Sequence, residues 1–166
     1  MDAFLAIVSK RDLRRYADRP LPEDVLTRIL DAGRLAGSAR NRQPWRFVVV
    51  ESADLKERLA ETVYAPDNVR GAPVAIAIVG KGGLDVGRCA QNMMLAAWNE
   101  GVGSCPNGMP DPARTAAVLG LGEGEEPAVV LTFGYPTFRP RPERRSPEEW
   151  GALADRKPLE ELVERR

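Results

Sequence analysis

The chain has 166 residues, about enough for one domain, and its 43% hydrophobic and 29% charged residues are typical of a globular protein. Its 24 basic and 24 acidic residues cancel, which argues against a general nucleic-acid-binding protein, because such proteins usually carry an excess of Lys and Arg. The chain has no histidine and only two cysteines, which excludes His-based catalytic triads and a structural zinc site built by the thiols alone.

The amino-terminal residues 2–9 form a short apolar stretch that predicts a helix. This stretch is too short, and lacks the basic start, for a secretory signal peptide. No apolar run in the chain approaches the roughly 20 residues that are needed to cross a bilayer. We therefore expect a cytoplasmic protein.

A cluster of cations follows this first helix. Lys10, Arg11, Arg14, Arg15 and Arg19 lie within ten residues of one another. In a neutral protein such a cluster indicates a local anion, and the arginine fork matches phosphate oxygens with paired hydrogen bonds. The alternative is a solvated basic helix end, and composition alone favours that alternative.

A helix is expected over residues 22–36, where apolar residues recur at helical spacing. A polar loop, residues 38–44, separates it from residues 45–51, which we interpret as a buried strand. Asn41 and Gln43 lie in this loop, and their amides could hydrogen-bond the edge of a planar heterocycle. Ordinary hydrogen bonding within the loop is the alternative, and the residues alone favour it.

The rest of the chain alternates between helical patterns and apolar strands. We expect helices at 54–64, 85–100 and 112–119, buried strands at 72–79 and 128–133, and short helices near 147–154 and 158–165. The strands are continuously apolar rather than alternating, which indicates a sheet that is covered on both faces. Helices between such strands predict an α/β or α+β sandwich.

Residues 101–108, Gly-Val-Gly-Ser-Cys-Pro-Asn-Gly, are expected to form a loop after the longest helix. Such a loop exposes backbone amides and allows a ligand to approach closely. The segment is not a dinucleotide-binding fingerprint, because the third glycine is absent and the loop follows a helix instead of a strand. No nucleophile–base pair is visible in the sequence, so an enzyme of this type would need a cofactor for its chemistry.

Taken in order, these segments resemble the nitroreductase family of FMN-dependent NAD(P)H oxidoreductases. The family's opening Arg-Arg-Ser-x-Arg-x-Phe/Tyr corresponds to residues 10–16, and its Pro-Ser-x-x-Asn-x-Gln-Pro-Trp loop corresponds to residues 37–45. The resemblance covers nearly the whole chain. The further matches are the strand from residue 72, the glycine-rich residues 101–105, Phe-Gly-Tyr-Pro at 133–136 and the late segment 156–163, which begins with Arg-Lys.

The resemblance implies a homodimer of α+β sandwiches, in which helices flank a central, mostly antiparallel sheet and one FMN binds at each of two interface sites. Residues 1–136 would form the core, and residues 137–166 a carboxyl-terminal arm of the same domain that crosses to the dimer partner. The implied chemistry is ping-pong: NADH or NADPH passes hydride to flavin N5, and a nitroaromatic, quinone or flavin acceptor then takes its place. Two alternatives stay open. One is another flavin reaction of this family, reductive dehalogenation or flavin fragmentation, and the other is a non-catalytic module that binds phosphate or nucleic acid.

The resemblance also implies which residues hold the cofactor, and it makes no side chain essential as an acid or base. A carboxylate at position 12, where the family has serine, is unfavourable beside a phosphate unless it pairs with an arginine or points away. Arg141, Arg144 and Arg145 compete with the late basic residues for the phosphate. The expected cofactor contacts are Lys10, Arg11, Asp12 and Arg14 in the first motif, Asn41 and Gln43 in the polar loop, Asn68 as a looser match, Pro106, Asn107 and Gly108 in the loop facing flavin N5 and O4, and Arg156 and Lys157 late in the chain.

Overall fold

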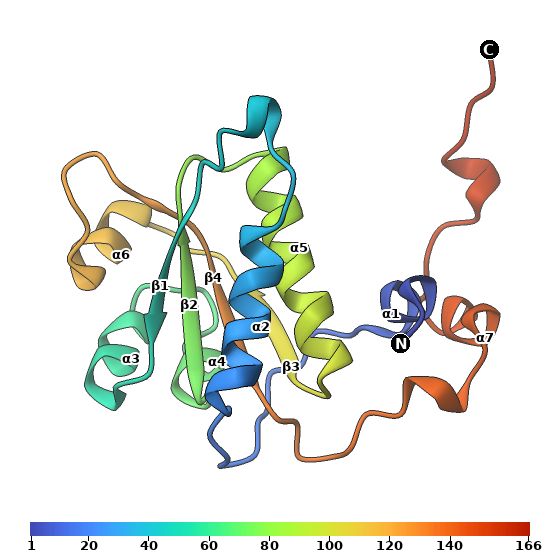
Figure 1. Ribbon diagram of the computed structural model, residues 1–166, viewed down its shortest axis with the longest axis horizontal. Coiled ribbons are helices and arrows are strands. Elements are labelled where there is room, and N and C mark those ends of the chain that lie inside the picture. The colour runs from blue at the N-terminus through green and yellow to red at the C-terminus, as the bar shows by residue number, and fades with distance from the viewer. The chain divides into compact units, whose positions relative to one another are not determined.

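The computed structural model describes all of residues 1–166, and a four-stranded antiparallel sheet is its central element (Figure 1). The strands lie in the order β1-β2-β4-β3. This arrangement confirms the expected α+β sandwich with an antiparallel sheet. The strand bounds are Arg46–Val50 for β1, Val74–Val79 for β2, Gly103–Asn107 for β3 and Pro127–Gly134 for β4.

Helices cover both faces of this sheet (Figure 1). Helices α2 (Glu23–Arg34) and α5 (Leu84–Asn99) pack on one face. The other face is covered by α3 (Ala53–Ala60), α4 (Pro66–Arg70) and α6 (Pro112–Leu119). All six residues of β2 are therefore buried, which explains why its sequence is continuously apolar.

Local signals place the helix ends. The side chains of Ser52 and Asp111 accept hydrogen bonds from the first turns of α3 and α6. Helix α6 ends at Gly120, whose φ of +64° is a left-handed conformation that glycine adopts without a steric penalty. These ends agree with the expected helix over residues 112–119.

Three expectations about local structure were wrong. Residues 101–108 do not form a loop throughout, because β3 occupies Gly103–Asn107. The helix expected over 54–64 ends at Ala60, and α4 follows as a separate short helix that the sequence pattern did not indicate. The helix expected over 158–165 is only a 3-10 turn, η3 (Leu159–Glu161).

The chain divides into two compact units, Arg11–Arg139 and a smaller unit that combines Met1–Lys10 with Pro140–Arg166. The sheet belongs to the larger unit. In the smaller unit, α1 (Ala3–Ser9) packs against α7 (Pro147–Ala152). The indole of Trp150 donates a hydrogen bond of 2.8 Å to the carbonyl of Pro142, in the 3-10 helix η2 (Pro142–Arg144). None of the helices has the length and apolar character that a membrane span requires.

Candidate functional site

The first basic motif runs along β3 at the edge of the sheet. Asp12 and Ser104 form a parallel bridge, and the Leu13 N–H donates a 3.0 Å hydrogen bond to the Ser104 carbonyl. Gly103 permits this approach, because a Cβ atom there would lie 2.9 Å from Cδ1 of Leu13. The segment 11–16, which we call the basic segment, is therefore fixed to the sheet by its backbone.

Tyr16 anchors the other end of the basic segment. Its hydroxyl lies 2.6 Å from the Leu13 carbonyl and 2.9 Å from Oγ1 of Thr132 in β4. Burial raises the pKa of the Tyr16 hydroxyl above its ordinary value, so the group stays protonated and can donate a hydrogen bond. Backbone and side-chain contacts together hold the residues between positions 12 and 16 against the sheet.

Two arginines of the basic segment are open to solvent. Arg14 and Arg15 are exposed, and neither makes a hydrogen bond or an ion pair within the chain. Arg19, in contrast, lies over the ring of Tyr135, with its guanidinium carbon 3.9 Å from the ring centroid. Uncompensated guanidinium groups on a fixed backbone can pair with an external anion without first breaking an internal salt bridge.

A buried polar network connects β3 to α4. Nδ2 of Asn68 donates a 2.9 Å hydrogen bond to Oδ1 of Asn107. Nδ2 of Asn107 in turn lies 3.0 Å from the Cys105 carbonyl and 3.3 Å from the Val130 carbonyl. Both asparagine side chains are thus engaged inside the chain, and they fix the end of β3.

The end of β3 presents backbone groups at the surface. Gly108 is exposed, its carbonyl accepts a 3.0 Å hydrogen bond from the Tyr64 N–H, and its own N–H has no backbone acceptor in the chain. Pro106 has no N–H, so among the residues 106–108 only Asn107 and Gly108 can offer a backbone donor. The expected amide pair at this position is therefore limited to these two residues.

The polar loop has an unusual backbone. Arg40, Asn41 and Gln43 have φ values of +54°, +52° and +49°, which is a left-handed conformation rarely adopted by residues with a side chain. Ser38 Oγ accepts a 2.8 Å hydrogen bond from the Gln43 N–H, which stabilises this turn. The amides of Asn41 and Gln43 are exposed. Such strain is characteristic of functional sites.

Within one chain, the polar loop and the basic segment lie at opposite ends of α5. The Ala39 N–H is bonded to Asp85 in the first turn of this helix, at 3.0 Å. Ser104, which carries the basic segment, follows shortly after the last turn. The 16 residues of α5 span about 24 Å, at about 1.5 Å per residue. One chain therefore does not bring Asn41 and Gln43 to the basic segment.

Gln43 also lines an open cavity of about 760 Å³ at the end of the sheet. Lys81 and Glu125 also line this cavity. Apart from Gln43, no residue that is expected to contact the cofactor lines it. The carboxylate of Glu125 pairs with the guanidinium of Arg46 across 2.6 Å. The cavity walls consequently hold an internal ion pair.

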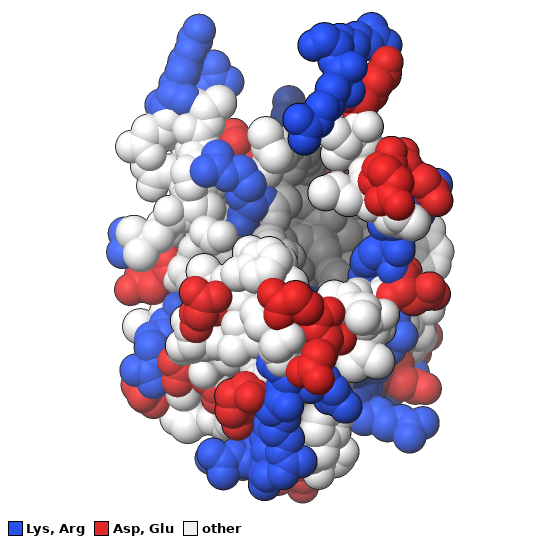
Figure 2. Space-filling view, turned by 90° about the vertical axis from the view of Figure 1, so that its right-hand side faces the viewer, with Lys and Arg blue, Asp and Glu red and all other residues white.

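Three expected contacts belong to the smaller unit. Lys10 follows α1 at its carboxyl-terminal cap. Arg156 and Lys157 are exposed, and Arg156 donates a 2.9 Å hydrogen bond to the carbonyl of Ala154. More generally, Lys and Arg side chains lie among Asp and Glu side chains on the face shown in Figure 2, which fits the zero net charge.

The family model for nitroreductases matches residues 7–66 and 64–135 of the chain. A Methanothermobacter thermautotrophicus relative, provisionally named NADH dehydrogenase/NAD(P)H nitroreductase, is 31% identical over 90% of this chain and 88% of its own length. The iodotyrosine deiodinase of Thermotoga neapolitana is 26% identical over 76% of this chain and 84% of its own.

The fold comparison agrees with the sequence comparison. A Desulfovibrio desulfuricans protein that was crystallised in complex with FMN superposes with a TM-score of 0.83 at 27% identity, and the match covers 100% of this chain and 98% of that one. The chain belongs to the nitroreductase family.

Proposed function

We propose that this protein is an FMN-dependent oxidoreductase that uses NADH or NADPH to reduce a small organic acceptor such as a nitroaromatic, a quinone or a flavin. The basic segment, with its uncompensated Arg14 on a backbone fixed to β3, is the observation that carries this proposal. The family match and the FMN-bound neighbour support it. Bound FMN would supply the hydride chemistry, and the protein supplies orientation and electrostatics.

The residues present fit the phosphate end of FMN. A phosphate at Arg14 gains charge-assisted hydrogen bonds, and Lys10 and Arg11 add positive charge in the same stretch of chain. Asp12 would oppose this binding only if its carboxylate faced the phosphate without a cationic partner, because the two groups carry the same sign of charge. Arg14 is therefore the strongest phosphate ligand that we assign.

The residues at the end of β3 fit the flavin ring. With FMN bound, the Gly108 N–H would donate to an acceptor of the ring, and a fixed backbone donor of this kind would stabilise negative charge there. We assign Asn68 and Asn107 a positioning role, since their side chains hold this backbone in place. Pro106 contributes shape to the site but no donor.

We further propose that the site is completed by a second copy of the chain. The strained loop that carries Asn41 and Gln43 is exposed and lies far from the basic segment of its own chain. In a two-fold dimer the loop of one copy can face the basic segment of the other, which generates two equivalent sites. Asn41 and Gln43 would then contact the FMN held by the partner.

The visible spectrum of the purified protein tests the proposal. We expect a yellow protein that releases FMN on denaturation and whose bound flavin is bleached by NADH or NADPH without oxygen. A colourless protein that also refuses added FMN would contradict the proposal. A panel of nitroaromatic, quinone, free-flavin and iodotyrosine acceptors then ranks the reactions. Preference for iodotyrosine would favour the second candidate, reductive dehalogenation, which the Thermotoga neapolitana relative supports.

Charge reversal at Arg14 tests the phosphate assignment. We expect Arg14→Glu to raise the dissociation constant of FMN roughly thirtyfold, which corresponds to a loss of about 2 kcal/mol for a charged hydrogen bond. Arg15→Glu is the matched control, because it changes net charge equally at a neighbouring exposed position. Fluorescence titration of each apoprotein with FMN measures the dissociation constant of both variants. Equal losses in the two variants would show a general electrostatic effect instead of a specific ligand.

A further inference from the structure

Tyr64 is a large side chain that the sequence motifs do not include, and 73% of it is exposed. The residue before it, Val63, is buried in the core beside α3. The Tyr64 hydroxyl makes no hydrogen bond within the chain. An aromatic ring is thus presented to solvent from a backbone that the core holds.

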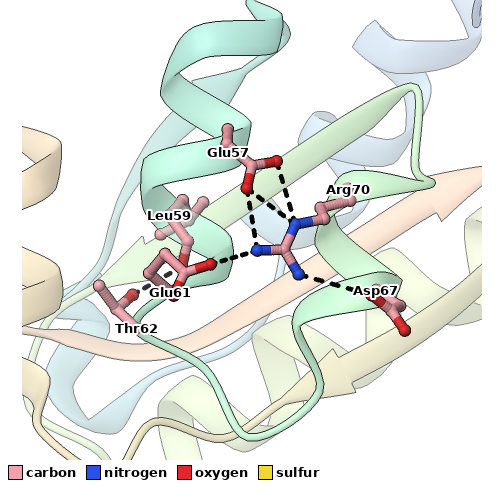
Figure 3. Close-up of polar contacts among 6 residues, drawn as sticks. All are labelled: Glu57, Leu59, Glu61, Thr62, Asp67 and Arg70. Atoms are coloured by element: carbon pink, nitrogen blue, oxygen red, sulfur yellow. Dashed lines mark hydrogen bonds and ion pairs between the residues drawn. The ribbon is translucent and has the colours of Figure 1, made fainter.

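Helix α4 begins at Pro66, two residues after Tyr64, and polar contacts connect it to the neighbouring elements (Figure 3). The guanidinium of Arg70 binds both carboxylate oxygens of Glu57 in α3, with Nε–O distances of 2.9 and 3.0 Å. It also pairs with Glu61 and reaches Asp67 at 3.5 Å. Together with the Asn68–Asn107 hydrogen bond described above, this cluster ties α4 to both α3 and β3.

The ring of Tyr64 lies against the end of β3. Its backbone N–H donates to the Gly108 carbonyl at 3.0 Å, and a Cβ atom at position 108 would lie only 3.2 Å from Cδ2 of the ring. Glycine at position 108 leaves room for the ring to remain there. The exposed aromatic face is therefore next to the backbone N–H that the proposed function assigns to the flavin.

We propose that Tyr64 is a specificity-determining residue that contacts acceptors with a planar aromatic ring. This inference rests on the proposed function, because it places the acceptor beside the flavin at Gly108. A planar acceptor can stack in an offset arrangement on the phenol ring. The Tyr64 hydroxyl, which has no partner in the chain, can donate to a nitro or carbonyl oxygen of the acceptor.

Titration of the oxidised, FMN-loaded protein with 4-nitrobenzoate tests this contact without turnover, through the change in flavin absorbance. We expect Tyr64→Ala and Tyr64→Leu to raise the dissociation constant about tenfold, as the loss of an aromatic pair predicts. Tyr64→Phe keeps the ring and should stay within about threefold of the wild type. Tyr64→Leu keeps apolar bulk, so it serves the test even if the alanine variant does not fold. Unchanged affinity in the leucine variant would overturn the inference.

Steady-state rates add a second readout. The ratio of kcat/KM for 4-nitrobenzoate to that for ferricyanide, which has no ring, should fall about tenfold in Tyr64→Leu. Leu35→Ala is the control, since it shortens another exposed apolar side chain, at the end of α2, and should leave the ratio unchanged. Conversion of Tyr64→Leu to a monomer would instead assign the residue to an interface and overturn the inference.

The two proposals fail in different ways. A wild-type chain that does not bind FMN would refute both the proposed function and the role of Tyr64. FMN-loaded variants whose affinity for 4-nitrobenzoate is unchanged would refute only the role of Tyr64.

Discussion

At the scale of single residues, the hydroxyl of Tyr16 connects the motif that we assign to the phosphate with the middle of the sheet. It bonds to Leu13, two residues from the start of the basic segment, and to Thr132 of β4. Thr132 also bonds to the Cys105 carbonyl, at 3.2 Å. The same polar network therefore supports both the proposed phosphate ligands and the proposed ring contacts.

We predict that Tyr16→Phe lowers the free energy of unfolding by about 1–2 kcal/mol, because the partly buried Leu13 carbonyl and the buried Thr132 hydroxyl lose their partner. Tyr64→Phe removes a hydroxyl that has no partner in the chain, and should change the free energy of unfolding by less than about 0.5 kcal/mol. Urea denaturation of the two apoproteins measures the difference. Equal stability of the two variants would show that the Tyr16 hydrogen bonds contribute nothing.

The raised pKa of Tyr16 also predicts how stability depends on alkaline pH. Burial is the main cause of the rise, so the unfolded chain releases this proton first, from about pH 10 upward. The stabilisation is complete below this pH and is lost as the pH rises towards the pKa of the folded state. We expect the stability of the wild type to fall more steeply above pH 10 than that of Tyr16→Phe. Thermal scans at several alkaline pH values measure Tm for both proteins. If Tm falls with pH at the same rate in the wild type and in Tyr16→Phe, the prediction is contradicted.

At the scale of elements, three strands were predictable and the fourth was not. Strands β1, β2 and β4 are rich in apolar and β-branched residues, whereas β3 is Gly-Ser-Cys-Pro-Asn, and Gly, Pro and Asn are uncommon in strands. Pairing with β4 and burial against the core impose the extended conformation on β3. Local propensity carries no information about such a tertiary contact.

The candidate site, like the sheet, has parts that the sequence could predict and parts that it could not. The basic segment and the polar loop could be proposed from the sequence, because their charges and amides lie close together along the chain and match two family motifs in order. Tyr64 was missed, since its meaning depends on its contact with Gly108, which lies 44 positions later. The internal hydrogen bonds of Asn68 could likewise be seen only once α4 was placed beside β3.

The cluster around Arg70 predicts an acid-sensitive contribution from the α3–α4 pair. Its hydrogen bond to Glu57 lowers the pKa of that carboxyl group, so the stabilisation is present above the ordinary pKa and is lost as the pH falls through the lowered one. We expect Arg70→Ala to lower Tm at pH 7, with a difference from the wild type that shrinks below about pH 4 and at high salt.

Arg34→Ala is the matched control for this prediction, because Arg34 pairs with a single exposed carboxylate, Asp31, at 2.8 Å. Its effect on Tm should be smaller, as expected for an isolated surface pair. Thermal scans at pH 7, 5 and 3.5 compare the two variants. A difference for Arg70→Ala that is independent of pH would mean that packing, not charge, accounts for its effect.

At the scale of the whole molecule, the smaller unit exposes several large apolar side chains. Phe4 and Ile7 of α1 are 59% and 56% exposed, and their spacing of three residues places them on one side of the helix. Leu159, Leu162 and Val163 near the carboxyl terminus are also exposed. Exposed apolar side chains on one side of a helix are typical of an association surface, which agrees with the dimer that we propose.

We predict that the wild-type chain sediments at twice 18.2 kDa and that the double variant Phe4→Lys, Ile7→Lys sediments as a monomer. Because the proposed site takes Asn41 and Gln43 from the partner, the double variant should lose FMN at the same time. Ala113→Lys together with Ala117→Lys, on the exposed side of α6, is the control with the same added charge and should remain dimeric. A monomer that retained full FMN affinity would refute a shared site.

The bridge between Asp12 and Ser104 has a further consequence, for the behaviour of the chain in concentrated solution. Strand β3 ends the sheet, and an uncovered edge strand is a template on which other chains can add strands and aggregate. The basic segment occupies part of this edge, and its exposed arginines repel a second molecule carrying the same charges. Residues that we assign to cofactor binding would thus also protect the newly made apoprotein from intermolecular sheet growth.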